Sequence, residues 1–142
     1  MKTNKTEACP VAALADEAER LVDAYAAVED ASESDEKVER YIPALSDFLD
    51  SIVDHASRER ATSAKGALFQ VAIASRFVEI LESDALDNSS EEKIRRAIQR
   101  TLRSVAHYIE STGGIRLKDS CARHFFVPSE LEDINAALAL AD

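Results

Sequence analysis

The chemically most distinctive feature of the sequence is a group of basic side chains between residues 93 and 107. At 100° per residue, their positions fall within an arc of about 80° on a helix, so they share one side of it. We call this group the basic stripe: Lys93, Arg96, Arg100, Arg103 and His107. Such a stripe could bind a nucleic-acid backbone, a phosphorylated ligand or an acidic protein surface.

The charge distribution around the basic stripe allows a purely structural interpretation. Residues 93–123 contain eight lysines and arginines against two acidic residues, whereas residues 1–92 contain nine against twenty-one. The stripe also lies about 180° from the apolar positions of its own segment, which is where an amphipathic helix carries its charge. We therefore favour a solvated face, or one paired with acidic side chains of this chain or of a second copy.

Residues that could bind a metal or perform catalysis lack their usual partners. Cys121 and His124 have the spacing of half a zinc site, but only His107 and Cys9 could complete it. No glutamate stands three residues before a histidine, as a di-iron bundle requires, and there is no glycine-rich phosphate loop or nucleophile elbow. We therefore predict no catalytic residue, no cofactor and no metal, and favour a non-enzymatic protein.

Length and composition limit the class of protein. The chain of 142 residues has the length of one domain, and its three glycines, three prolines and missing tryptophan favour helix over sheet. The formal charge of -10 repels nucleic acids and anionic membranes on average. No segment approaches the roughly 18 uninterrupted apolar residues of a membrane span, and the first residues lack the apolar stretch of a signal peptide. We expect a cytoplasmic protein with two free thiols and no membrane association.

Apolar residues spaced three and four apart predict the helices that must position these groups. One helix runs from Pro10 into the polar stretch 29–36, after a disordered tail at residues 1–8. A second covers residues 38–54, where Pro43 marks either a kink or the helix start. A capping box of Ser89 and Glu92 begins a later helix, which ends near Ser111. Its predicted buried side comprises Ile94, Ile98, Leu102, Val105 and Ile109. A second capping-box spacing, at residues 129–132, predicts a short C-terminal helix.

The segment from about residue 58 to residue 83 differs because it carries apolar residues on two faces. One face comprises Ala64, Leu68, Val71 and Val78, and the other comprises Phe69, Ile73, Phe77 and Ile80. A helix of this kind must be covered from both sides. Either it lies at the centre of the fold, or a second copy of the chain covers one face. We assign the second face, Phe69 to Ile80, as the candidate self-association surface.

Together these patterns predict an all-α fold, with one domain over residues 1–142 that forms a bundle of four main helices and a short C-terminal helix. For the function, we infer a non-enzymatic interaction or regulatory module that self-associates into a homo-oligomer, with an unidentified protein partner. One alternative is a nucleic-acid-associated regulator that uses the basic stripe. Another is a small-ligand carrier or an enzyme with a pocket between helices.

Overall fold

The computed structural model describes residues 8–31, 40–83 and 85–120. Every regular element in these ranges is helical, which confirms the predicted all-α class. The chain forms two compact units, Met1–Tyr108 and Ile109–Asp142. The single domain over residues 1–142 stays a prediction. The predicted C-terminal helix and nearly all of the predicted N-terminal tail lie outside the described residues.

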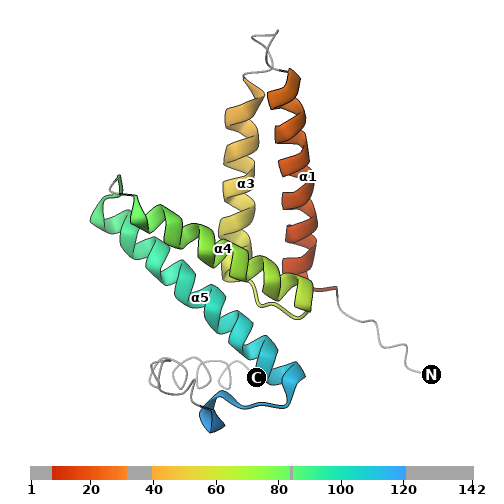
Figure 1. Ribbon diagram of the computed structural model, residues 1–142, viewed down its shortest axis with the longest axis vertical. Coiled ribbons are helices and arrows are strands. Elements are labelled where there is room, and N and C mark those ends of the chain that lie inside the picture. The colour runs from red at the N-terminus through yellow and green to blue at the C-terminus, as the bar shows by residue number, and fades with distance from the viewer. Residues whose placement is uncertain (1–7, 32–39, 84, 121–142) are drawn as a thin grey trace, which may run out of the picture. The chain divides into compact units, whose positions relative to one another are not determined.

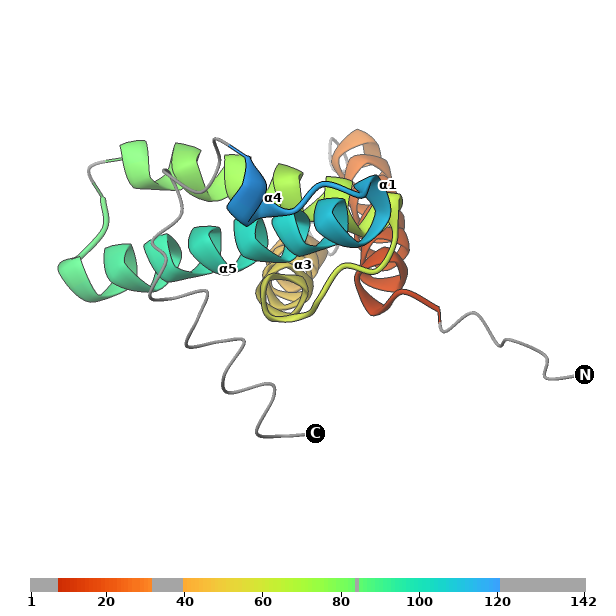
Figure 2. The ribbon, with the colours of Figure 1, turned by 90° about the horizontal axis from the view of Figure 1, so that it is seen from below.

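The first unit is built from four helices in its described part. They are α1 (Pro10–Ala31), α3 (Tyr41–Arg58), α4 (Ala64–Glu82) and α5 (Asn88–Gly113), the last as far as Tyr108. The helices α1 and α3 lie side by side, and so do α4 and α5 (Figure 1). The second pair crosses the first near the N-terminal end of α1 and the C-terminal end of α3 (Figure 2). Segments distant in sequence therefore meet at this crossing.

Side-chain caps explain where α4 and α5 begin. The hydroxyl of Ser63 accepts a hydrogen bond from the N–H of Gly66 at 3.1 Å, before the first turn of α4. Asp87 Oδ1 accepts one from the N–H of Ser90 at 2.7 Å and so caps α5. The predicted cap, Ser89, is wrong, because it lies inside the helix. A carboxylate outcompetes a hydroxyl here because its charge also interacts favourably with the helix N-terminus.

Two other predicted boundaries are close to the observed ones. Helix α3 begins at Tyr41, so Pro43 lies in its first turn, where proline removes no helical hydrogen bond. Helix α5 ends at Gly113, and Gly114 follows with φ of 65°. This left-handed backbone conformation is the usual reason for a glycine after a helix.

Small side chains form much of the core of the first unit. One cluster lies where the start of α1 meets α3, α4 and the loop between them: Cys9, Val11, Ala56, Ala61, Ala67 and Ile73. A second cluster, between α1 and α3, comprises Ala18, Leu21 and Ile52. Short side chains allow close approach of the helices. A Cβ atom added at Gly66, for example, would lie only 2.8 Å from the sulfur of Cys9.

The structure corrects the predicted orientation of α5. Small residues are the most buried ones of this helix, and Ala97, Thr101 and Ser104 share one face. Leu102 and Ile109, which were predicted to be buried, are 43% and 50% exposed. At 100° per residue, the observed buried face is rotated by about a quarter turn from the predicted one. The small side chains let α5 lie closer to its neighbours than leucine and isoleucine would.

The second unit is described only as far as Ser120. It contains the last residues of α5 and a single 3-10 turn, η2 (Leu117–Asp119). An ion pair between Arg116 Nε and Asp119 Oδ2, at 2.8 Å, spans this turn. In both units, none of the described helices has the length and apolar character needed to cross a membrane.

Candidate functional site

An open groove of about 430 Å³ lies between α3, α4 and α5 in the first unit. Its lining combines apolar and charged side chains. The apolar ones are Val53, Phe77, Ile80, Ile94 and Ala97, and the charged ones are Asp50, Asp54, Arg58, Lys93, Arg96 and Arg100. Pockets of a few hundred Å³ with an apolar lining and a few polar groups are typical of small-ligand sites.

Buried polar side chains fix α4 and α5 against the end of α3. The amide of Gln70 is fully buried and donates to the carbonyl oxygens of Ala56 and Glu59, at 2.9 and 2.7 Å. The hydroxyl of Ser104 accepts a hydrogen bond from the N–H of Ala61 at 2.8 Å. These bonds satisfy backbone groups at and beyond the α3 C-terminus, which would otherwise be buried without partners. The three helices that line the groove are therefore held in register.

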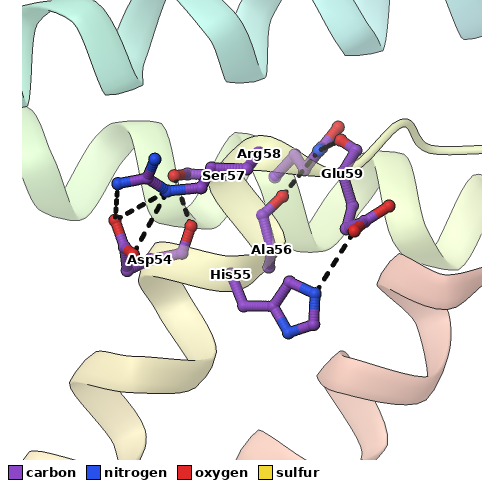
Figure 3. Close-up of polar contacts among 7 residues, drawn as sticks. Asp54, His55, Ala56, Ser57, Arg58 and Glu59 are labelled. Atoms are coloured by element: carbon purple, nitrogen blue, oxygen red, sulfur yellow. Dashed lines mark hydrogen bonds and ion pairs between the residues drawn. The ribbon is translucent and has the colours of Figure 1, made fainter.

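The last turn of α3 carries the charged edge of the groove (Figure 3). Arg58 Nε lies 3.2 Å from Asp54 Oδ2, and the hydroxyl of Ser57 donates to the carbonyl of Asp54 at 2.7 Å. The ring of His55 points to Glu59, with Nε2 3.2 Å from Oε1. Exposed pairs of this kind stabilise a fold little. The ion pair matters for position instead, because it holds Arg58 and Asp54 together beside the groove.

Arg100 occupies an unusual environment in this groove. It is half-buried, and its guanidinium makes one long hydrogen bond, from Nη2 to Ser57 Oγ at 3.4 Å. The buried Nε has no acceptor among the described residues. Burial lowers the pKa of Arg100, as does repulsion from Arg58 and Arg96, while attraction to Asp54 opposes them. The protein thus holds a guanidinium in a site that disfavours its charge.

The basic stripe does not form one solvent-facing surface. Lys93, Arg96 and Arg100 line the groove, whereas Arg103 and His107 are half-buried and lie outside its lining. The rotation of α5 explains the division, because it turns one edge of the stripe towards α3. A fully solvated stripe is therefore the wrong interpretation for Arg100.

The structure also corrects the assignment of the two faces of α4. In the predicted self-association face, Ile73 is 3% exposed, and Phe69 and Phe77 pack against the core. Ile80 lines the groove together with Phe77. The part of this face at Phe69 and Ile73 is therefore covered by the chain itself, whereas Phe77 and Ile80 border the open groove. On the opposite face, Leu68 is 70% exposed, and Val71 and Val78 are 45% and 44% exposed.

Cys9 is a buried free thiol beside the first turns of α1 and α4. Its sulfur accepts a hydrogen bond from the N–H of Thr62 at 3.3 Å. Burial raises the pKa of this thiol, but hydrogen bonds from Ser63, Thr62 and the backbone of Ala12 outweigh it and lower the pKa to about 6. Cys121 and His124, the other candidate metal ligands, lie outside the described residues. Within the described ranges, no three His, Cys, Asp or Glu side chains are grouped so as to hold a metal ion.

Sequence reasoning missed the part of the groove that α3 supplies. Asp54 and Arg58 have the spacing of a helical ion pair, which is visible in the sequence. Their position beside Arg100 is not visible, because Ser57 and Arg100 are 43 residues apart in the chain. The apolar pattern of its helix likewise gives no signal for the buried amide of Gln70.

Comparisons with known proteins add no assignment to this geometry. No protein-family model matches the sequence, and searches of curated proteins and of solved structures give no match either.

Proposed function

We propose that the protein is a non-enzymatic, self-associating interaction module, and that two copies meet through the outer face of α4. The observation that carries this proposal is the row of exposed apolar side chains at Leu68, Val71 and Val78. With Ser75 they follow steps of three, four and three residues, which is the spacing of a coiled-coil seam. Ile73 and Phe69 on the inner face of α4 pack in the core, so the exposed outer face is the one offered to a second copy.

Charge favours an antiparallel arrangement of the two α4 helices. Lys65 lies near the start of α4 and Glu79 near its end, and the side chains of both are more than half exposed. In an antiparallel pair each Lys65 approaches Glu79 of the other copy, whereas a parallel pair would not bring these two residues together. The small side chain of Ala72 lies between them on the same flank and allows close approach. The in-chain partners of these residues, Asp16 and Arg76, limit this contribution, so apolar burial must dominate.

This arrangement fits the general form of homodimers. A two-fold interface uses the same patch on both copies, so Leu68 of one copy meets Val78 of the other. Burying one such side chain contributes roughly 1.5–3 kcal/mol, and the two-fold axis doubles each contact. The alternative function in nucleic-acid binding is less well supported, because Asp50 and Asp54 lie in the groove beside the basic residues of α5.

Light scattering coupled to size exclusion tests the proposal. We expect the wild-type chain to give the mass of a dimer over a range of concentrations, with little effect of salt. Leu68→Glu should weaken dimerisation about tenfold or more, because each copy places a carboxylate in an apolar seam. Val22→Glu is the matched control, since Val22 is 52% exposed but lies on α1. A wild-type protein that is monomeric at the highest concentration would refute the proposal.

Oxidative cross-linking tests the antiparallel direction. Leu68→Cys mixed with Val78→Cys should give a covalent dimer whose linked peptides contain residues 68 and 78. Leu68→Cys alone should link poorly through that residue, because the two copies of Leu68 lie at opposite ends of the seam. Efficient linkage between two copies of residue 68 would instead indicate a parallel pair and contradict the charge argument.

A further inference from the structure

Arg100, in the groove between α3, α4 and α5, leaves most of its hydrogen-bonding capacity unused. Arg58 contacts Asp54 at 3.2 Å, and Arg96 contacts Glu92. Arg100 has no carboxylate partner among the described residues; its Nη2 reaches only Ser57 Oγ at 3.4 Å, and its Nε reaches no acceptor. Nε and Nη2 form one edge of the planar guanidinium, which is the edge that binds carboxylate or phosphate in a bidentate manner. Because Nε is buried and has no acceptor, an anion in the groove would satisfy it once this edge turns towards the groove.

The electrostatic environment of Arg100 favours an anion in the groove. Arginine stays protonated at any pH at which proteins fold, so partial burial leaves a desolvated charge. Arg58 and Arg96 repel it, and Asp54, whose carboxylate is engaged by Arg58, compensates only in part. An oxyanion bound to Arg100 would restore the lost solvation and reduce this repulsion. Arg58 and Arg96, which destabilise the charge of Arg100 in the empty groove, would therefore stabilise a bound oxyanion.

Apolar side chains lie next to these donors in the groove lining. Phe77 and Ile80 come from α4 and Val53 from α3, and all three are only partly buried. An apolar group placed on them would cover surface that is now open to water, at roughly 25 cal/mol per Å². The groove of about 430 Å³ has room for such a group together with its anionic end.

We propose that this groove binds a small amphiphilic ligand that carries one oxyanion, a carboxylate or a phosphate, on an apolar body. Arg100 binds the oxyanion, Lys93 and Arg96 add positive potential, and Phe77 and Ile80 contact the apolar body. Asp50 and Asp54 line the same groove and repel further negative charges. This charge pattern selects a ligand with one anionic end over a polyanion such as nucleic acid.

Isothermal titration calorimetry with a matched set of probes tests this proposal on the full-length protein. Octanoate combines a carboxylate with an apolar chain, octanol lacks the charge, and acetate lacks the chain. We expect saturable binding of one octanoate per chain and no measurable binding of octanol or acetate at the same concentrations. Equal binding of octanoate and octanol would overturn the role of the oxyanion. Equal binding of octanoate and acetate would overturn the role of the apolar lining.

Monooctyl phosphate separates the two sources of the oxyanion. Tighter binding of the phosphate than of octanoate assigns a phosphate ester, and the reverse assigns a carboxylic acid. Both outcomes support the shared chemistry. If neither probe binds, the proposal is refuted.

Variants of Arg100 test the named contact. Arg100→Gln should weaken octanoate binding about tenfold or more, as expected for the loss of a charge-assisted bidentate contact. Arg100→Lys should give an intermediate affinity, because it keeps the charge and loses the planar edge. Arg95→Gln is the control on the same helix, since Arg95 pairs with Glu91 and lies outside the groove lining.

Two further measurements keep the result interpretable. Circular dichroism should show that Arg100→Gln unfolds at the same or a higher temperature, because a poorly solvated charge is removed. In addition, ¹⁵N-edited NMR should show the Nε–H resonance of Arg100 moving on addition of octanoate and absent from the Arg100→Gln spectrum. Undiminished octanoate affinity in folded Arg100→Gln would overturn the proposal. None of these results depends on whether the protein dimerises.

Discussion

Replacing Gly66 with alanine tests the contact between the first turns of α1 and α4. The new Cβ atom would lie 2.8 Å from Cys9 Sγ, 3.1 Å from Val11 Cβ and 3.3 Å from Ala12 N. Alanine in a helix is favoured over glycine by roughly 0.5–1 kcal/mol, whereas overfilling a packed core costs about 1–3 kcal/mol. Because two of the three atoms belong to the rigid start of α1, we expect a net loss of about 1–2 kcal/mol.

A double-mutant cycle isolates the part of this loss that is due to the sulfur. Cys9→Ala alone should destabilise the protein, because the N–H of Thr62 loses its acceptor. The double variant should be more stable than the sum of the single variants predicts, by about 0.5–1 kcal/mol, since the closest clash is absent. Urea unfolding followed by far-ultraviolet circular dichroism gives these free energies.

Gly113→Ala is the control for the intrinsic effect of alanine. The nearest atom to a Cβ at Gly113 is Ile109 Cγ2, at 3.9 Å, which is an ordinary contact. We expect this variant to be as stable as the wild type or more stable by roughly 0.4–1 kcal/mol. If Gly66→Ala behaves like Gly113→Ala and shows no coupling to Cys9→Ala, α1 does not pack on α4 through these residues.

Two further predictions concern the same junction of helices. Hydrogen bonds lower the pKa of Cys9 to about 6 in the folded protein, against 9.0 for an unperturbed thiol. Between these two pH values, folding therefore releases a proton from the thiol. The free energy of unfolding should rise with pH in this window, by up to about 1.4 kcal/mol per pH unit. Urea titrations from pH 6 to pH 9 should show this rise, and Cys9→Ser should lack it; equal slopes would place the thiol pKa outside the window. Gln70→Leu should destabilise the protein by about 2–4 kcal/mol, because the buried carbonyls of Ala56 and Glu59 lose their donor. Thermal unfolding checks this against Gln99→Leu on the exposed side of α5, and a Gln70→Leu variant as stable as that control would contradict the role of the amide.

The helices themselves were predictable because their apolar residues recur with clear helical spacing. The stripes of α1 and α3 lead directly to the observed elements, and Gly113-Gly114 marks the end of α5 correctly. The start of α5 was less well determined because Asp87 and Ser89 both have residue types that cap helices. Only the hydrogen bond from Ser90 to Asp87 distinguishes them.

The orientation of α5 was not predictable from apolar spacing. That pattern ranks positions by hydrophobicity, and by this measure Leu102 and Ile109 outrank Ala97 and Ser104. In the structure, burial of these positions instead depends on close packing, which places the small side chains of Ala97 and Ser104 inside and leaves Leu102 and Ile109 exposed. A row of small residues at 97, 101 and 104 was present in the sequence as a signal for close helix packing. Weighing that row against the larger apolar residues requires the shape of the partner surface.

The same packing explains why the groove was missed and why its arginine is informative. Arg58 and Arg96 each form an ion pair with a carboxylate four residues earlier on the same helix, a contact that needs no tertiary structure. Arg100 has Arg96 at the preceding position of this spacing and Ser104 at the following one, so its own helix offers no acid. It is then turned inward by the small residues next to it, towards Ser57 rather than towards a carboxylate. The missing carboxylate partner of Arg100 therefore follows from local sequence and close packing together. It leaves a positive charge next to the apolar side chains that line the groove.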